Sequence, residues 1–167
     1  SGDLHRYFVE SLVDHLPPEA ARFLVLVSFV DNLSPALCEA ITLQPDCAAT
    51  LSRLRELTPI FSESVDGDWS RIHPLAREFL VSRFARLPEA ERREYHARAA
   101  HWLEAHGQYE EAARQMLEAG LVDTAYGLVA RVLHDVLIRG QVSVVADWIE
   151  RLPQAEILKR TSLRLTV

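Results

Sequence analysis

The sequence predicts a mainly α-helical protein: a winged-helix domain with a small β-hairpin over residues 1–87, followed by tetratricopeptide-like repeats over residues 88–167. Apolar residues recur at three- and four-residue spacing along most of the chain, which is typical of amphipathic helices. One Asp-Gly pair between two β-prone runs indicates a single hairpin. Small and apolar residues around Gly107 partly recur around Gly140, as in helical repeat proteins.

The first two helices are predicted from their apolar faces and from the prolines between them. The first runs from Leu4 to Leu16, where Pro17-Pro18 ends it. Its expected apolar stripe is Leu4, Phe8, Leu12 and Leu16, widened by Val9 and Val13. Pro18 suits the first position of a second helix, which runs to about Val30. Because this helix is apolar on most sides, we expect it at the centre of the core.

Two shorter helices follow, each with a polar residue at its expected start. Ser34 is the expected cap of a helix that has Pro35 at its first position and ends near Ala40. After a turn, Asp46 is the expected cap of a helix from Cys47 to about Leu57. The inward-facing positions of that helix are expected to be Leu51 and Leu54.

The hairpin and the helix after it complete the first domain. Residues 60–65 and 69–73 flank Asp66-Gly67, and both central positions of such a turn favour a positive φ. Pro74 then begins a helix whose expected apolar stripe is Leu75, Phe79, Leu80, Phe84 and Leu87. A short helix, a turn, a second helix and a hairpin together indicate a winged helix.

The repeat prediction for residues 88–167 rests on small residues that let antiparallel helices approach closely. The positions typical of a tetratricopeptide repeat are Ala100, Leu103, Gly107, Tyr109, Ala112, Met116 and Ala119. A degenerate second copy consists of Leu133, Val136, Gly140, Val145, Ile149 and Leu152. Because one repeat buries little surface alone, we expect further stacking and interpret the chain as the start of a truncated solenoid.

The charge and composition argue against several classes of protein. With 24 acidic and 18 basic residues, the net charge of −6 is unlike that of a nucleic-acid binder. Arg53 and Arg55 on the expected fourth helix are offset by Glu56 and by an acidic hairpin turn. No apolar run is long enough to span a membrane. The two cysteines, Cys38 and Cys47, are expected as buried small residues of a cytoplasmic protein.

The search for catalytic or metal-binding motifs predicts no enzyme. The six glycines form no phosphate-binding loop, and neither a metalloprotease nor a serine-hydrolase motif is present. His96, His101 and His106 are five residues apart, so a helix turns each away from the last and they cannot share a metal. We therefore expect them as solvated helix histidines, with no catalytic residue, no metal ligand and no cofactor in this chain.

His73 is the one candidate binding residue. It lies at the end of the second hairpin strand and directly before Pro74, so it is expected to cap the following helix. Its ring and the free backbone N–H groups beyond Pro74 are expected to point at one spot, which combines a positive helix end with a switchable donor and suits a phosphate. The alternative is a cap histidine that packs beside Trp69.

Several runs of the sequence also resemble one known family. The most specific run is Ile72-His73-Pro74-Leu75-Ala76-Arg77-Glu78-Phe79-Leu80. The others are Tyr7-Phe8-Val9-Glu10, Leu16-Pro17-Pro18-Glu19, Arg22-Phe23-Leu24, residues 28–41, Leu51-Ser52-Arg53-Leu54, Pro59-Ile60-Phe61, residues 96–102 and residues 107–112. Together they resemble the middle of the large ATP-binding LuxR-type transcription regulators of the MalT type, which are signal-transduction ATPases with numerous domains.

The resemblance implies a regulatory, non-catalytic role between an ATPase domain and a C-terminal DNA-binding module. It implies that His73 contacts the β-phosphate of ADP in the full-length parent, which would bind ATP or ADP. The expected partners are the parent's own ATPase domain, through the winged helix, and an inducer or partner protein, through the repeats. DNA is expected only through the C-terminal module.

Three points stay open at this stage. Tyr109, Tyr126 and Trp148 could line a binding groove in the repeats, and packing between helices is the alternative. The whole chain could instead be a free-standing helical-repeat scaffold for protein interaction. A third hypothesis, which the charge disfavours, is a winged-helix repressor that binds DNA directly.

Overall fold

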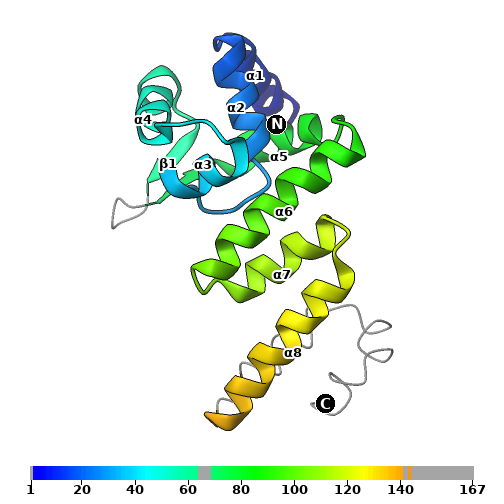
Figure 1. Cartoon of the computed structure of the whole chain (residues 1–167). Coiled ribbons are helices and arrows are strands. Elements are labelled where there is room, and N and C mark those ends of the chain that lie inside the picture. Colours follow the sequence, from blue (N-terminus) through cyan, green and yellow to red (C-terminus); the bar gives the residue numbers. More distant parts are fainter. Residues whose placement is uncertain (1, 64–68, 141–142, 144–167) are drawn as a thin grey trace. The chain divides into compact units, whose positions relative to one another are not determined.

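The computed structural model describes residues 2–63, 69–140 and 143 and is mainly α-helical (Figure 1). The chain divides into two compact units, residues 1–98 and 99–167. The predicted boundary at Leu87-Pro88 lies in the turn between two helices, whereas the first unit continues to Arg98. Within the described residues, no helix is long and apolar enough to cross a membrane.

The first unit has the element order of a winged helix, as predicted. Its elements are α1 (Gly2–Asp14), α2 (Pro18–Val27), α3 (Pro35–Thr42), α4 (Cys47–Leu57), β1 (Phe61–Glu63), β2 (Ser70–Ile72), α5 (Pro74–Phe84) and the first part of α6 (Glu89–Ala105). Proline stands at the first turn of α2, α3 and α5, where its missing N–H costs nothing. The three prolines therefore fix these helix starts as the sequence predicted.

The core of the first unit lies between α2, α3 and α5. The largest side chains buried there include Phe23 and Leu24 of α2, Leu37 and Ile41 of α3, and Leu80 of α5. Leu51 and Leu54 of α4 are buried as predicted, as are Cys38 and Cys47. The prediction that the second helix lies at the centre of the core is thus confirmed, although it ends at Val27 rather than near Val30.

The buried faces of α1 and α5 agree with the predicted stripes only in part. Val9 and Val13 are the buried residues of α1, whereas Leu4 is 69% and Phe8 59% exposed. In α5 the buried residues are Ala76, Leu80 and Phe84, and Leu75 is exposed. Both helices carry more apolar residues than one face can hold. The packing of α1 on α5, and of α5 on α2, buried Val9, Val13, Leu80 and Phe84 as predicted, and left Leu4, Phe8 and Leu75 exposed.

The starts of α3 and α4 show one correct and one wrong cap prediction. The Ser34 hydroxyl accepts a hydrogen bond from the Leu37 N–H at 3.2 Å, as expected of a cap. Asp46 occupies the cap position of α4, but its φ is +56° and its side chain makes no cap hydrogen bond. The Cys47 N–H donates instead to the Glu39 carboxylate at 3.3 Å. A carboxylate from α3 thus replaces the local cap.

The hairpin consists of two short antiparallel strands, with Phe61 opposite Ile72. On its other edge, β2 pairs with residue 33 through a bridge from Leu33 to Ser70. Arg55 of α4 donates to the Ser70 hydroxyl, which places α4 beside the hairpin (Figure 1). The predicted Asp66-Gly67 turn lies outside the described residues.

His96 corrects the prediction of a solvated helix histidine. Only 8% of it is exposed, and its ring centroid lies 4.4 Å from that of Phe29 and 5.3 Å from that of Phe84. It belongs to the part of α6 that completes the first unit. An imidazole is a small aromatic ring, so it can pack against both phenylalanines in this core position.

The second unit contains the end of α6, α7 (Tyr109–Glu118) and α8 (Val122–Ile138), of which α7 and α8 pack on one another. The apolar repeat positions predicted in this region are buried: Ala100, Leu103, Ala112, Met116 and Ala119. Gly107 has a φ of +76° and Gly140 a φ of +75°, so equivalent repeat positions share one backbone conformation after a helix. Val145, Ile149 and Leu152 lie outside the described residues, and the second repeat stays a prediction.

Candidate phosphate-binding site at the junction of β2 and α5

His73 lies where the hairpin ends and α5 begins. Its backbone N–H donates to the Ile60 carbonyl at 2.7 Å, which continues the ladder beyond Ile72. Its carbonyl accepts from the Arg77 N–H at 2.9 Å, which starts the helix. The residue therefore belongs to both elements, and its exposed side chain is held at their junction.

The ring of His73 caps α5, as predicted. Its Nδ1 accepts a hydrogen bond from the Leu75 N–H at 3.3 Å. Because a backbone N–H can only donate, the neutral ring carries its proton on Nε2. Nε2 makes no hydrogen bond among the described residues, so it is the donor that the junction presents to a ligand.

In the first turn of α5, two of the predicted backbone donors are already used. Pro74 has no N–H, and the N–H groups of Leu75 and Arg77 both donate to His73 itself. These groups are therefore not free to bind a phosphate. The cap uses Nδ1 of the imidazole, so Nε2 remains as the ring's donor.

Arg77 fixes this junction to the rest of the unit. Its guanidinium donates to the carbonyls of Ser28 and Phe29, at 2.9 and 3.1 Å, just beyond the end of α2. Its third nitrogen pairs with Asp31 at 2.8 Å. One side chain of α5 thus caps α2, and this ties the start of α5 to the centre of the core.

Arg71 precedes His73 by two residues on β2 and is also exposed. Its Nε donates to the Asn32 side-chain oxygen at 2.6 Å. Asn32 adjoins Leu33, whose bridge to Ser70 pairs the two segments, so Asn32 and Arg71 are neighbours across that bridge.

An open cavity of about 640 Å³ adjoins the junction. Its lining residues are Asp31, Asn32, Arg71, Ile72, Pro74, Arg77, Glu78 and Val81. Ile72 and Pro74, the two chain neighbours of His73, line it, whereas His73 does not. The cavity has room for a small polar ligand, and its lining includes two arginines and two carboxylates.

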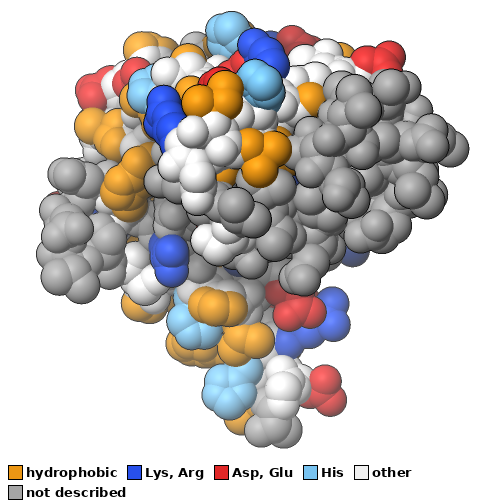
Figure 2. Space-filling model, turned by 90° about the horizontal axis from the view of Figure 1, so that it is seen from below, with side chains coloured by type: hydrophobic (Ala, Val, Ile, Leu, Met, Phe, Trp, Pro, Cys, Tyr) orange, Lys and Arg blue, Asp and Glu red, His pale blue; other side chains and the backbone are white. Residues whose placement is uncertain are grey.

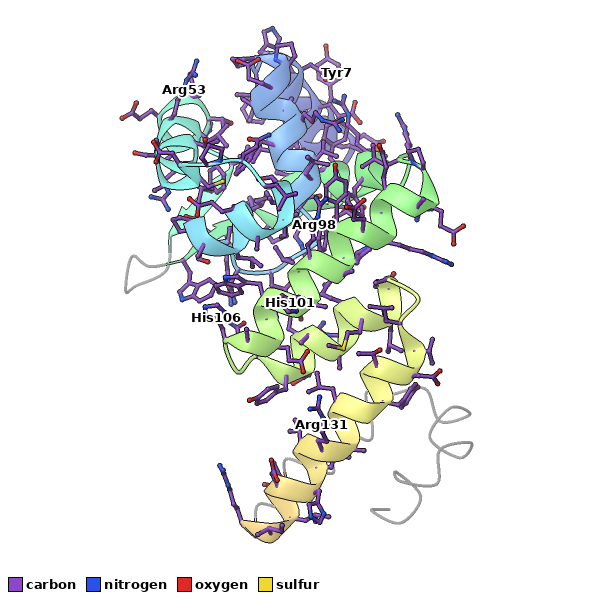
Figure 3. All side chains as sticks on the ribbon, in the orientation of Figure 1. Tyr7, Arg53, Arg98, His101, His106 and Arg131 are labelled. Atoms are coloured by element: carbon purple, nitrogen blue, oxygen red, sulfur yellow. The ribbon has the colours of Figure 1, made fainter. Side chains whose placement is uncertain are left out.

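The distribution of arginine side chains bears on the hypothesis that the winged helix binds DNA. On the face in Figure 2, the described arginine side chains are scattered among acidic and apolar ones. On α4, Arg53 projects outward (Figure 3), whereas Arg55 is engaged with Ser70. The described part of α4 therefore presents one outward arginine rather than a row of base-reading side chains.

The remaining candidate residues form no second site within the described part of the chain. No group of three His, Cys, Asp or Glu there could hold a metal. His106 stacks on Trp102, with ring centroids 3.8 Å apart. Burial raises the pKa of the Cys38 thiol to about 12, and burial likewise raises that of Cys47. Both cysteines are therefore protonated, inert core residues.

The aromatic residues considered for a groove in the second unit have different positions. Tyr126 is buried, which confirms packing between helices as its role. Tyr109 is exposed and lines an open cavity of about 490 Å³ with Glu104 and Arg131, which form an ion pair at 3.2 Å. Trp148 lies outside the described residues.

Comparison with known proteins agrees with the predicted family. The family model of the MalT winged helix domain matches residues 9–95. The chain is 25% identical over 166 residues to serine/threonine-protein kinase PknK of Mycobacterium tuberculosis strain H37Rv, an alignment that covers 98% of this chain and 15% of that protein. It is 28% identical over 169 residues to HTH-type transcriptional regulator MalT of Vibrio parahaemolyticus (95% and 18%).

A further relative is HTH-type transcriptional regulator AlkS of Alcanivorax borkumensis. It is 24% identical over 163 residues, which covers 96% of this chain and 19% of that protein. The chain thus spans less than a fifth of each of these three relatives.

Proposed function

The chain belongs to the MalT winged helix domain family, and on that premise we propose that it is the regulatory middle of a larger, ATP-dependent LuxR-type transcription regulator. The winged helix would dock on an ATPase domain of the same protein and couple its nucleotide state to the helical repeats. The repeats would receive an inducer or a partner protein, for which the cavity beside Tyr109 is one surface. DNA would be bound by a separate C-terminal module.

The observation that carries this proposal is the orientation of His73. Its Nδ1 is held by the Leu75 N–H, so its Nε2–H, which bonds no described residue, is available to a ligand. This N–H would donate to the β-phosphate of ADP bound in the ATPase domain. The contact favours the resting state only to the extent that ADP binds His73 better than ATP does.

The size of the effect follows from the strength of one hydrogen bond to a charged group. Such a bond contributes about 1.5–3 kcal/mol, which corresponds to roughly a 10- to 150-fold change in affinity. In this chain alone we expect no measurable nucleotide binding, because one histidine lacks the contacts that an ATPase domain supplies.

The test uses the full-length protein in which this chain occurs. His73→Ala is expected to release ADP about 10-fold faster or more, and to raise basal transcription from a target promoter. His73→Asn is a useful second variant, since asparagine can still cap α5 but has a different reach. Unchanged ADP release and unchanged basal activity in both variants would refute the proposed role of His73.

The similarity to PknK supports a second candidate for the effector of the parent. That relative is described as a serine/threonine-protein kinase, and its alignment covers 98% of this chain. The same coupling unit could therefore regulate a kinase domain instead of a DNA-binding module. Assays of the full-length protein for transfer of the ATP γ-phosphate to serine or threonine, and for promoter binding, distinguish the two effectors.

A free-standing repeat scaffold and a direct DNA-binding repressor are the alternatives from other classes. Sequencing the source gene on both sides of this chain tests the first, since a regulator requires a phosphate-binding GxxxxGK[ST] loop upstream. Salt-dependent duplex binding by the chain itself would support the second, against the net charge of −6.

A further inference from the structure

We propose that Arg71 is a second phosphate-binding residue, which acts together with His73 on the diphosphate of one nucleotide. This inference rests on the proposed function of His73 and adds a residue and a ligand chemistry to the same site. It follows from three features of β2: which side chains share a face, how Arg71 is held, and what its charge is paired with.

Arg71 and His73 share the exposed face of the hairpin. Ser70 and Ile72 are buried, whereas Arg71 and His73 are exposed, as expected of a strand whose side chains alternate. The Ile60 carbonyl accepts from the His73 N–H, so the strand geometry continues to the histidine. Residues two apart on a strand start about 6–7 Å from one another, so the side chains of Arg71 and His73 can converge on one phosphate group, the β-phosphate.

Arg71 is held in place by one edge of its guanidinium. Its Nε donates to Asn32, which the bridge from Leu33 to Ser70 fixes in register. Its two terminal nitrogens donate to no other described residue. They form a planar, preoriented pair of donors, which matches the geometry of a phosphate.

The two arginines of the cavity differ in what they are paired with. All three guanidinium nitrogens of Arg77 are used, and its charge is balanced by Asp31. The side-chain partner of Arg71 is a neutral amide, so the charge of Arg71 is left uncompensated by that contact. Arg77 is therefore a structural residue, and Arg71 is the cation that the junction offers to an anion.

Glu78 limits how the cavity can be used. It lines the same space and makes no ion pair in the described part of the chain. A carboxylate repels a phosphate, so we assign the anion to the strand edge of Arg71 and His73 and not to the cavity as a whole.

The experiment measures nucleotide release from the full-length protein, with ADP and AMP as probes. Arg71→Ala is expected to release ADP about tenfold faster or more, because hydrogen bonds to a charged group are lost. Arg71→Lys keeps the charge but not the paired donors, so its rate is expected between the two. AMP has no β-phosphate, and its release is expected to be the same from Arg71→Ala and the unchanged protein.

Arg53→Ala is the matched control, because Arg53 is an exposed arginine of the same unit on α4, away from the junction (Figure 3). It is expected to leave ADP release unchanged. The double variant Arg71→Ala/His73→Ala is expected to lose less than the sum of the two single effects on the free-energy scale, since both residues contact one ligand group.

Each outcome separates this inference from the proposed function. Fast ADP release from His73→Ala with normal release from Arg71→Ala would overturn the role of Arg71 and leave that of His73 intact. Normal release from both single variants would overturn the proposed function as well. Equally fast loss of ADP and AMP from Arg71→Ala would show a general loosening of the domain and would also overturn the proposed contact.

Discussion

Arg77→Ala tests whether one side chain ties the start of α5 to the end of α2. The substitution removes two hydrogen bonds to the carbonyls of Ser28 and Phe29 and an ion pair with Asp31. Arg83→Ala is a matched control on the same helix. Arg83 pairs with Asp14 at 2.7 Å, its side chain is 34% exposed against 35% for Arg77, and it bonds no backbone carbonyl of a described residue.

The magnitudes follow from these contacts. A half-exposed ion pair contributes about 0–1 kcal/mol. Hydrogen bonds from a charged group contribute about 1.5–3 kcal/mol each when buried, and water recovers roughly half of that at a partly exposed site. We therefore expect a cost of about 2–3 kcal/mol for Arg77→Ala. Arg83 also lies 4.5 Å from the ring centroid of Phe79, so we expect about 0.5–1.5 kcal/mol for Arg83→Ala.

Urea denaturation of the 167-residue chain measures the difference. Amide NMR signals from α2 and α5 follow the first unit separately from the second, so each unit gives its own midpoint. Asp31→Ala removes the ion pair but leaves both hydrogen bonds from Arg77 to the backbone carbonyls in place, so it is expected to cost less than Arg77→Ala. An Arg77→Ala cost equal to that of Arg83→Ala would refute the bridging role, because the two arginines would then differ in nothing that matters for stability.

Two further predictions concern backbone strain and the buried thiols. Gly107→Ala is expected to lower the free energy of unfolding by about 1 kcal/mol, since φ at Gly107 is +76°. Gly127→Ala within α8 is expected to raise it by about 0.5–1 kcal/mol. Neither added Cβ meets a neighbouring atom within 4 Å, apart from adjacent residues and the helix backbone, so thermal unfolding reports the backbone effect, and stability changes of the same sign in both variants would contradict this prediction. The pKa of Cys38 is raised from 9.0 to about 12, so the native state keeps the thiol proton where the unfolded chain loses it. The stabilisation from this difference is therefore complete below pH 9 and is lost as the pH rises toward 12. Denaturation from pH 8 to 11 should show this loss in the unchanged chain and less of it in Cys38→Ala, and thiol reagents should label Cys38 only after unfolding.

The local signals in the sequence predicted most helix starts correctly. Ser34 and His73 both cap the helices that they precede, because a cap depends only on residues a few positions away. Asp46 also has a cap-forming side chain directly before a helix, yet the carboxylate that accepts the first N–H of α4 belongs to Glu39. That carboxylate belongs to the preceding helix, and only the packing of α3 on α4 brings it within reach.

The sequence could not decide which of several apolar residues on one helix would be buried. Phe8 and Leu75 are exposed although both are large and apolar, and the smaller Val9 and Ala76 take their places in the core. His96 is the reverse case, since a polar residue is buried between Phe29 and Phe84. Which side chains are buried depends on how closely neighbouring helices approach one another. The periodicity of apolar residues in one helix does not contain that information.

For the candidate site, too, part of the arrangement follows from the sequence and part only from the tertiary structure. The sequence by itself determined that His73 stands between a strand and a proline-initiated helix, since both elements follow from local residue order. Only the tertiary structure decided that the ring accepts the Leu75 N–H and leaves Nε2 as its donor. It also decided that Arg77 binds the end of α2 and Asp31, whereas Arg71 binds the neutral side chain of Asn32. These partners lie in the segment that follows α2, which is distant in sequence and comes next to β2 and α5 only when the chain folds.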